Sequence, residues 1–503
     1  MTRISRRGLI KGAAAGTAAL VGSRLLELPY LMAQAAPTGD KAKLRTAVIG
    51  CGGRGTDAMV PPAAAENLVA LIDPDAGRIA NAIKRAKKVA DDNRRPFDET
   101  KIKTYSDYRK FFDEMAKEVD AVFIATPNHH HALPALLAMQ RGIAAFVEKP
   151  MAYDIHETRL MAEYSQKYKV ATQMGNQGHT QGYYHVLYEL IHAGAIGNVT
   201  EVYSWCDRQN GGVGPRPRTM PVPAGLNWDQ WIGPAPYRDY HPDKITLDKE
   251  GKERISHMHP HEWHHWHDFG GGSLGNMGCH ILDGAHWALN LNGPSSFEVE
   301  EVNGGSDERY PIGTRIRWEF PQRGDLPPVK LFWYDGKSSQ SKSKEQGQDD
   351  SVAASAQNFP PLLQELKKQF KDTDEKFDSN GTLYVGDKGM MYTGTYGGGV
   401  RILPKEKHDE YMKANGKPKE LLRRSKGGHT TDFLNGIRDP NHIPLSNFVE
   451  AAKLTEFVLQ GCTSLRLPNQ GLGTKVQWNG TKSTNSPEFN ALIQRKYREG
   501  WSY

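Results

Sequence analysis

A histidine-rich segment carries the most conspicuous potential chemistry in this sequence. Residues 257–272 read HMHPHEWHHWHDFGGG and hold six of the chain's 19 histidines. Residues 261–265 match H-E-x-x-H, a pattern in which a helix presents two zinc-binding histidines and a glutamate base on one face. The three glycines that follow would end such a helix within two turns, and the longer form of the pattern finds Asp268 and Gly271 where its glycine and third histidine belong. We therefore expect no metal, and a zinc peptidase is the least favoured hypothesis.

The tryptophans of the same segment suit a carbohydrate. An aromatic face can stack on the apolar face of a sugar, while neighbouring imidazoles bond to its hydroxyl groups. Candidate substrate contacts are Trp263, Trp266 and His267. The alternative is a packed aromatic hairpin whose histidines have only structural roles, and the sequence does not decide between the two.

A second set of chemically useful residues lies near the start of the mature chain. An apolar strand from Lys43 to Ile49 runs into residues 50–55, GCGGRG, which satisfy G-x-G-x-x-G. A helical stretch and a second strand follow, and that strand ends at Asp73. Such glycines let the backbone approach a pyrophosphate at a helix N-terminus, and the acid at this distance binds the ribose hydroxyls. The pattern predicts a Rossmann domain that binds NAD, with NADP as a possible substitute.

Two further strands also end in polar residues. Residues 120–125 lead into TPNHHH, and residues 144–147 lead into Glu148, Lys149 and Pro150. Ligands of an open parallel sheet bind at the carboxyl ends of its strands. A solvated loop would explain polar residues after one strand. It explains less easily why several neighbouring strands are followed by polar residues at the same edge of the sheet.

These motifs resemble those of the Gfo/Idh/MocA oxidoreductase family. The resemblance rests on GCGGRG, ATPNHHH and EKP in this order, on the glycine run that enters a helix with Asn276 and His280, and on the ending YREGW. It implies that Lys149 and His280 are catalytic. It also implies cofactor contacts from Gly50, Gly52, Gly53, Arg54, Gly55, Asp73, Thr126, Pro127, Asn128, His131, Glu148, Lys149 and Asn176.

The helix after the glycine run carries four polar or aromatic residues at helical spacing. Asn276, His280, Asp283 and Trp287 are separated by 4, 3 and 4 residues, so a single helix would place them on one face, away from His286. We expect Asn276, His280 and Asp283 to contact the substrate. Family members usually have Asp where this chain has Asn276, which cannot act as a base but can still orient a hydroxyl.

From about residue 199 the pattern becomes rich in β-strands. Segments 199–205, 297–302, 314–320, 329–334, 382–385 and 400–403 are apolar or alternating. We predict an α/β protein with an N-terminal Rossmann dinucleotide-binding domain (43–170), and a C-terminal α+β domain (171–480) built on an open, mostly antiparallel sheet. A C-terminal tail (481–503) would pack back on the body. The exposed face of the sheet would support a homo-oligomer.

The N-terminus predicts export. Residues 1–35 hold a twin-arginine motif, an Ala- and Gly-rich run and the exit Ala33-Gln34-Ala35, the order of a twin-arginine signal peptide. The run contains Arg24, Glu27 and Pro29, so we expect no stable membrane insertion. This segment supplies +4 of the formal net charge of +6, and the remainder gives no reason to expect nucleic-acid binding. We therefore expect a periplasmic or extracellular protein.

Together these features favour an NAD(P)-dependent oxidoreductase that acts on the CH–OH groups of a sugar or polyol. Free NAD is scarce outside the cytoplasm, so we expect the cofactor to stay tightly bound. The alternative is a redox-neutral, NAD-dependent enzyme of the same family that cleaves glycosides by oxidation, elimination, hydration and reduction. A non-catalytic nucleotide-bound sensor is less favoured, because Lys149 and His280 are both present.

Overall fold

Six short parallel strands form the first sheet of the computed structural model, which describes residues 43–339 and 357–503. The strands are β1 (Arg45–Ile49), β2 (Asn67–Ile72), β3 (Lys103–Tyr105), β4 (Ala121–Ile124), β5 (Ala144–Val147) and β6 (Thr172–Met174). Their order, β3-β2-β1-β4-β5-β6, is that of a doubly wound nucleotide-binding sheet. β4 and β5 are buried along their whole length, which explains their unbroken apolar sequences. The predicted twin-arginine segment, residues 1–35, lies outside the described residues.

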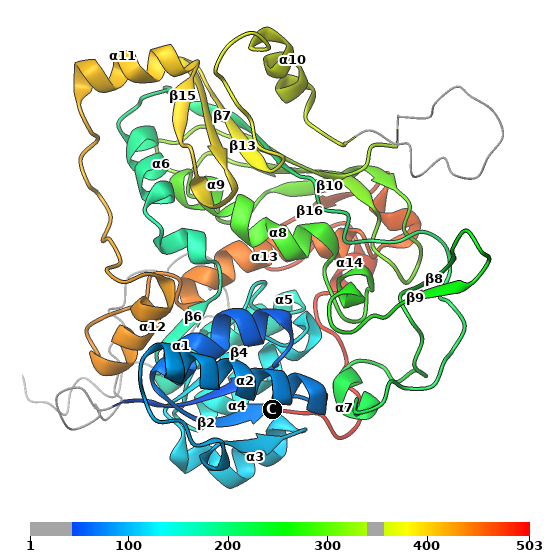
Figure 1. The fold of residues 1–503 in the computed structure, drawn as a ribbon. Helices are drawn as coiled ribbons and strands as arrows, with labels where there is room; N and C mark the ends of the chain where they lie inside the picture. The colour runs from blue at the N-terminus through cyan, green and yellow to red at the C-terminus, as the bar shows by residue number, and fades with distance from the viewer. Residues whose placement is uncertain (1–42, 340–356) are drawn as a thin grey trace, which may run out of the picture. The chain divides into compact units, whose positions relative to one another are not determined.

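Helices cover both faces of this sheet, as the blue and cyan part of Figure 1 shows. They are η1 (Gly55–Met59), which continues into α1 (Val60–Ala65), then α2 (Ala76–Asp92), α3 (Tyr108–Met115), α4 (Ala132–Gln140) and α5 (Ile155–Tyr168). Asp75, Asp107 and Asp154 each cap the helix that follows by accepting a backbone N–H. The Rossmann prediction is confirmed, although β6 places the end of the sheet beyond the expected limit at residue 170.

The second sheet has eight strands and is mostly antiparallel, as predicted. Its order is β15-β14-β13-β7-β12-β11-β10-β16, and its pair β7–β12 is parallel. The strands are β7 (Val199–Cys206), β10 (Ser296–Asn303), β11 (Gly313–Phe320), β12 (Val329–Gly336), β13 (Gly381–Gly386), β14 (Gly389–Gly394), β15 (Arg401–Leu403) and β16 (Lys475–Gln477). A small hairpin, β8 (Lys244–Leu247) with β9 (Glu253–Ser256), stands apart from it.

One face of the second sheet packs on helices that also reach the first domain. α8 (Gly272–Ile281) and α13 (Phe448–Ser464) lie between the sheet and the Rossmann domain (Figure 1). α13 contacts both α8 and α5, so its two sides join the domains. The remaining helices are α6 (Tyr183–His192), α7 (Trp228–Ile232), α9 (Asp283–Ala288), α10 (Pro361–Gln369), α11 (Lys405–Asn415), α12 (His429–Arg438) and α14 (Pro487–Ala491).

The opposite face of the second sheet is divided into two unlike halves. Leu363 and Leu366 of α10 pack on Trp205, Leu383 and Tyr392, so the chain itself covers this half. The other half carries an ion-pair ladder, in which Arg317 pairs with Glu298, Glu300 and Glu319. The face that we expected to be open for a partner subunit is therefore partly closed and elsewhere strongly charged.

The helix predicted to carry both Asn276 and Trp287 is interrupted. α8 ends at Ile281, Leu282 separates the segments, and α9 begins at Asp283. His280 and Asp283 therefore belong to different helical segments. The expectation that Asn276, His280, Asp283 and Trp287 share the face of one helix is therefore wrong.

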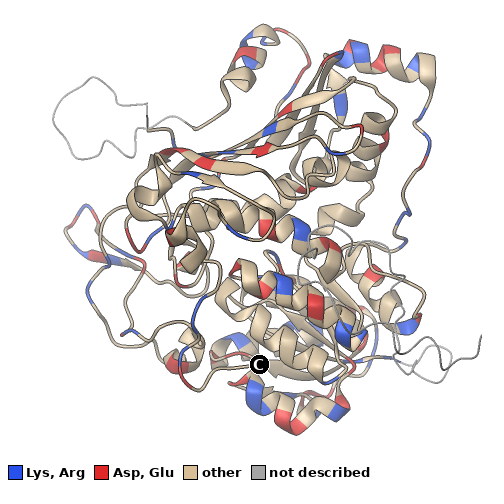
Figure 2. Cartoon of the chain, turned by 180° about the vertical axis from the view of Figure 1, so that it is seen from behind, with Lys and Arg blue, Asp and Glu red and all other residues tan. Residues whose placement is uncertain are grey.

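Positions of Lys and Arg and positions of Asp and Glu are interspersed along the helices, strands and loops of both domains (Figure 2). Among the described residues, no helix combines the length and the apolar character needed to cross a membrane.

The C-terminal tail returns to the Rossmann domain, as its red trace in Figure 1 shows. The Arg495 guanidinium bonds to the Glu157 carboxylate at 2.6 Å, and Tyr497 donates a further hydrogen bond to the same oxygen. Arg495 also donates to the His129 carbonyl. Since the side chains of Glu157 and Arg495 are only 3% and 10% exposed, this pair fixes the tail in a nearly dry environment.

Replacing Arg495 by Met should destabilise the protein by about 3 kcal/mol, because it leaves the Glu157 carboxylate buried without its cation. Urea unfolding measures the change. Lys88→Met is the matched control, since Lys88 and Asp92 form a pair that is 63% and 56% exposed, and it should change stability by no more than about 0.5 kcal/mol. Equal effects of the two substitutions would contradict the structural role given to the tail.

Candidate active site

A pocket lined by both domains lies at the carboxyl ends of β1, β2, β4 and β5. The first domain lines it with the glycine turn, with Asp73 and with residues of the segments that follow β4 and β5. The predicted cofactor contacts found in its lining are Gly50, Gly52, Gly53, Arg54, Asp73, Thr126, Pro127, Asn128, His131, Glu148 and Lys149. This is the position at which a doubly wound sheet binds a dinucleotide.

The glycines of the turn have separate roles that fit a pyrophosphate. Gly50 has a φ of +89°, and a β-carbon there would lie 2.6 Å from the Ala125 carbonyl carbon. A β-carbon on Gly55 would lie 1.8 Å from the Gly50 oxygen, so this glycine permits the helix to pack on the strand. Gly52 and Gly53 instead face open space, with no atom within 4 Å of an added β-carbon. The turn is thus tight where the protein packs and open where a phosphate would lie.

Asp73 fixes the turn from the end of β2. Its Oδ2 accepts the Cys51 N–H at 2.7 Å, and its Oδ1 accepts the Asp75 N–H at 2.8 Å. Burial raises the pKa of Asp73 to about 7, although both backbone bonds act to lower it. The carboxylate can still accept ribose hydroxyl groups, and it would repel a 2′-phosphate.

Lys149 lies where the first domain meets the second. Its Nζ donates to the backbone oxygen of Asn276 at 2.8 Å and to the side-chain oxygen of the same residue at 2.9 Å. Asn276 in turn donates to Asn210 at the end of β7. Burial lowers the pKa of Lys149, and the cations Arg54 and Arg208 lower it further, whereas Glu148 opposes them. At neutral pH a larger fraction of this lysine is therefore unprotonated than of a solvated lysine, and only the unprotonated amine can accept a proton.

Glu148 completes this group of charges. Arg54 of the glycine turn bonds to Glu148 at 2.7 Å, so the residue before Lys149 is tied to the dinucleotide turn. Arg208, at the end of β7, is exposed and forms no ion pair with a described residue. Sequence reasoning missed Arg208, since a single arginine after a strand carries no recognisable pattern.

His280 lies one helical turn after Asn276 and is buried. Its Nδ1 has no hydrogen-bond partner among the described residues. Burial lowers the pKa of His280 well below its usual value, and the charges of Lys149 and Arg54 act in the same direction. The imidazole is therefore neutral at physiological pH, and the edge-to-face ring contact with Tyr396, at 4.9 Å between centroids, helps to hold its plane.

Asn176 and Asp283 belong to a separate small cavity. Asn176 donates to Asp283 at 3.0 Å, and His179 bonds to the same carboxylate at 2.9 Å. Burial acts to lower the pKa of His179, but the Asp283 charge outweighs it and the pKa is raised. Both residues line this cavity with Trp287 and not the dinucleotide pocket. Their predicted contacts with cofactor and substrate are not seen in this geometry.

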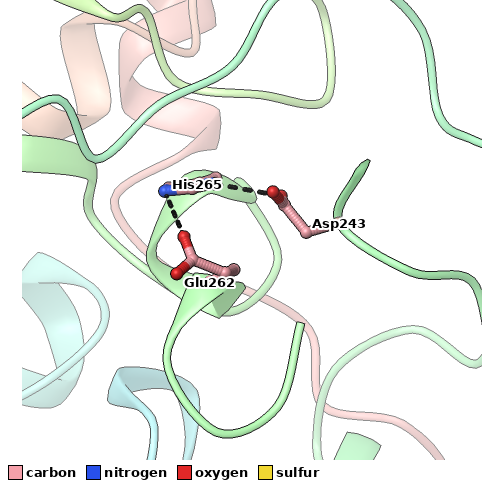
Figure 3. A group of neighbouring side chains, drawn as sticks. All are labelled: Asp243, Glu262 and His265. Atoms are coloured by element: carbon pink, nitrogen blue, oxygen red, sulfur yellow. Dashed lines mark hydrogen bonds and ion pairs between the residues drawn. The ribbon is translucent and has the colours of Figure 1, made fainter. Parts of the chain in front are cut away.

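The histidine-rich segment does not form a zinc-peptidase helix. Residues 262–265 form one short turn (η6), and His261 is exposed rather than paired with His265. Figure 3 shows that His265 instead lies between two carboxylates, with Nε2 2.9 Å from Glu262 and Nδ1 3.0 Å from Asp243. Burial acts to lower the pKa of His265, and the two acids reverse the effect and raise it.

Asp243, Glu262 and His265 lie close enough to be tested as a metal site. The hydrogen bonds argue for an ion-pair network instead, because His265 uses both ring nitrogens on two different acids. Asp243 also accepts bonds from Trp266 and Arg309, and a guanidinium 3.0 Å from the carboxylate competes with a cation. The three residues therefore brace this segment against the loop before β8.

The predicted sugar contacts of the same segment separate into two groups. Trp263 lines the dinucleotide pocket, together with His261 and His264, which sequence reasoning did not select. Trp266 is fully buried in a tryptophan-rich core, and His267 bonds to the Asp307 carbonyl. Trp266 and His267 are therefore packing residues in this structure.

The other half of the pocket has a cover that sequence reasoning missed entirely. Trp231, His259 and Trp501, which come from α7, the loop after β9 and the tail, line the pocket together with the residues of the first domain. His259 bonds to Asp75 at 2.9 Å, and Asn227 donates to the Pro74 carbonyl at 2.8 Å. The Arg109 guanidinium lies 3.8 Å over the Trp501 ring. No local motif indicates this cover, since its parts come together only in the folded chain.

The fold and the pocket define an NAD-binding oxidoreductase. Residues 44–176 match the model of the oxidoreductase family's NAD-binding Rossmann fold, and residues 196–322 match its C-terminal alpha/beta domain, both of the Gfo/Idh/MocA family. The chain belongs to this family, and NAD is its cofactor. Lys149 and the glycine turn lie within the first match, and His280 lies within the second.

Curated relatives match only part of the chain. A 2,7-anhydro-N-acetylneuraminate hydratase from Mediterraneibacter gnavus is 34% identical over 91 residues, which is 18% of this chain and 24% of the relative. A glucose-6-phosphate 3-dehydrogenase from Bacillus subtilis is 29% identical over 90 residues, 18% of this chain and 26% of the relative. The chain thus spans about a quarter of the length of these relatives.

Similarity of fold covers much more of the chain than similarity of sequence. The WlbA dehydrogenase from Chromobacterium violaceum, solved with NADH and UDP-GlcNAcA, has a TM-score of 0.51 at 13% identity. The alignment covers 90% of this chain and 99% of that one. At this identity the likeness supports the two-domain fold.

Replacing Asp73 by Ser should shift the cofactor preference from NAD towards NADP by about tenfold or more, because it removes the carboxylate that repels a 2′-phosphate. Dissociation constants of both nucleotides, measured by calorimetry, check this expectation. Asp75→Ser is the comparison, since the Asp75 carboxylate bonds to His259 and caps α2. An unchanged ratio in the Asp73 variant would contradict the assigned role.

Strong chelators should leave activity and the thermal midpoint unchanged, since His265 is held by two carboxylates and a guanidinium shares Asp243. Elemental analysis should find less than one zinc per chain. One tightly held zinc, lost together with stability in His265→Gln, would overturn the ion-pair interpretation.

Proposed function

We propose that this protein transfers hydride between NAD and a CH–OH group of a carbohydrate or polyol. The observation that carries the proposal is the position of Lys149, a half-buried amine in the lining of the dinucleotide pocket that is bonded to the second domain. The sugar dehydrogenases among the similar proteins support a carbohydrate as the substrate class. Trp263 at the same pocket provides an aromatic surface for it.

Bound nicotinamide supplies the site that accepts or returns hydride. The protein must then manage the hydroxyl proton. When a sugar hydroxyl group is oxidised, its proton passes to the Lys149 amine. The hydride leaves the carbon that bears this hydroxyl and passes to the nicotinamide. The lowered pKa of Lys149 keeps a useful fraction of the amine unprotonated. In the reverse direction the protonated amine returns the proton to the carbonyl oxygen.

His280 serves this reaction as a neutral hydrogen-bonding group. Its pKa is lowered by burial and by Lys149, so it resists protonation. Its assignment, like that of Lys149, follows from the family motif. His280 does not line the dinucleotide pocket itself, but it lies one helical turn after Asn276, to which Lys149 donates. Asn276 holds Lys149 without adding a charge, so it keeps the amine's pKa low where an aspartate would raise it.

The cover over the pocket supports a tightly held cofactor. Trp231, His259 and Trp501 line the pocket from outside the Rossmann domain, and two hydrogen bonds and a cation–π contact attach their segments to that domain. Release of a dinucleotide would require the cover to open. The reaction would then restore the oxidised cofactor within the site, through a second substrate or a later step.

A redox-neutral glycoside-cleaving reaction is the alternative. It oxidises a sugar hydroxyl, removes the proton on the adjacent carbon, expels the glycosidic oxygen, adds water and reduces the carbonyl. A retained cofactor suits this sequence, and the resemblance to a hydratase is in keeping with a lyase-like step. The dehydrogenase remains the first proposal. It needs one group that transfers the hydroxyl proton, whereas the cleavage reaction needs further groups for elimination and for the addition of water.

Export by the twin-arginine route to the periplasm or beyond is proposed from residues 1–35. A twin-arginine route carries folded proteins, which suits a cofactor enclosed by the chain. A homo-oligomer is proposed through the charged half of the second sheet, since α10 covers the other half. Size-exclusion chromatography with light scattering tests the oligomer.

Purified protein tests the proposed function directly. It should release NAD on denaturation, and it should act on a member of a panel of monosaccharides, polyols and aryl glycosides. Following nicotinamide absorbance and released aglycone together separates the two reactions, since net oxidation changes the first and redox-neutral cleavage the second. No turnover with any member, by a protein that retains NAD, would contradict both.

Lys149→Ala and His280→Ala should each lower kcat by about 10²–10⁴-fold, because each removes a group that transfers a proton or orients the substrate. NAD content and thermal midpoint should stay close to wild type. The pH–rate profile for oxidation should rise to a plateau with a midpoint below the ordinary lysine value of 10.5, since burial lowers the pKa of Lys149.

His286→Ala is the control for these substitutions, since His286 lies in α9, stacks on Phe457 and lines the separate cavity. Its catalytic rate should be nearly unchanged. Asn276→Asp should raise the pKa of Lys149 and move the pH midpoint upward. Full activity of Lys149→Ala on the best substrate would contradict the assignment.

A further inference from the structure

Tyr396 occupies a backbone conformation that its side chain disfavours. It lies in η7 (Thr395–Gly397), the turn after β14, with φ +59° and ψ +20°. This left-handed region suits glycine, and a bulky residue found there is an outlier that often marks a functional site. The sequence around it is Thr-Tyr-Gly-Gly-Gly, so glycines are plentiful next to the one position that keeps an aromatic ring.

The surrounding structure holds the turn in this conformation. The Gly394 N–H donates to the Gly398 carbonyl at 2.7 Å. A β-carbon on Gly178 would lie 3.1 Å from the Tyr396 α-carbon, and one on Gly397 would lie 2.7 Å from the Tyr184 ring. The contacts therefore fix the Tyr396 backbone between α6, η5 (Gln177–Thr180) and α8.

The same contacts aim the Tyr396 ring at the catalytic helix. Its ring meets the His280 imidazole edge to face, at 4.9 Å and 77°. Tyr184 hydrogen-bonds to the His280 carbonyl, so the residue that packs on the turn also holds α8. Tyr396 is partly exposed, and its hydroxyl has no hydrogen-bond partner among the described residues. The phenol is thus fixed beside His280 and is available to a ligand.

The chemistry of the site leaves a place for such a donor. Lys149 manages a proton from the first domain, but its Nζ is already bonded twice to Asn276. His280 is neutral and has an unpartnered buried Nδ1. A sugar presents several oxygens, and the oxygen next to the reacting one needs a donor that is neutral and rigid. A phenol held by its own backbone meets this need with little loss of conformational freedom on binding.

We propose that Tyr396 is a substrate-binding residue of the active site, whose hydroxyl donates a hydrogen bond to a sugar oxygen beside His280. The inference rests on the proposed carbohydrate reaction and adds to it a residue from the second sheet that lies in neither family motif. The strained backbone is retained because it delivers the phenol to a position that a relaxed turn would not reach.

Tyr396→Phe tests the hydroxyl alone, since it keeps the ring contact with His280. We expect kcat/KM on the best sugar to fall by about 100-fold, as for loss of one preorganised donor, with NAD content and thermal midpoint unchanged. Tyr396→Gly removes the ring and relieves the left-handed strain. It should lower activity at least as far while leaving the thermal midpoint equal to wild type or higher.

Tyr183→Phe is the matched control. Tyr183 lies on α6 beside Gly397 and is 50% exposed, and this substitution should leave kcat/KM unchanged. A purely structural Tyr396 would give the opposite pattern: Tyr396→Phe would be fully active, and Tyr396→Gly would lose thermal stability. That result would overturn the inference.

A failure of the proposed function is distinguished from a failure of this inference by assaying the wild-type protein. A wild type that neither turns over nor binds any member of the sugar and glycoside panel removes the basis of this inference as well. With an active wild type, the ratio of variant to wild-type kcat/KM decides the role of Tyr396.

Discussion

The bond between Lys149 and Asn276 is the constraint on which the active site depends. An amine from the end of β5 donates twice to one residue of α8, so the Rossmann domain and the second domain meet at the atom expected to carry the proton. The same residue is half-buried; desolvation lowers its pKa, and two arginines lower it further. A neutral amide is a suitable partner here, because it binds the lysine without stabilising its charged form.

Around this bond, each domain supplies what the other lacks. The first offers a glycine turn with open space at Gly52 and Gly53 and an acid at Asp73. The second offers Trp263 in the pocket lining, and His280 with the ring of Tyr396 against it one helical turn after Asn276. The tail and the α7 region then cover the pocket, so segments at opposite ends of the chain enclose one ligand site. Such an enclosure suits a cofactor that acts as a permanent part of the enzyme.

The histidine-rich segment shows how neighbouring charges give different roles to buried residues of one motif. His265 lies between Asp243 and Glu262 and becomes more basic, whereas His264, six positions from the glycine run, is buried and becomes less basic. Trp263 faces the pocket and Trp266 faces the core, although both read alike in the sequence. Residues 261–265 match a metal-binding motif, but the short turn does not place His261 and His265 on one face. His265 instead forms ion pairs with Asp243 and Glu262.

The sequence by itself determined the two-domain fold, the NAD site and the position of Lys149, because these depend on local features. Strand periodicity, a glycine turn and polar strand ends are read within about 30 residues. The tertiary structure alone decided which residues face the pocket. Asp283 bonds to His179 in a separate cavity, and burial made Trp266 a core residue. Trp501 lies more than 100 positions from the other cover residues, Trp231 and His259, and Tyr396 lies more than 100 positions from His280, so these side chains meet only when the chain has folded.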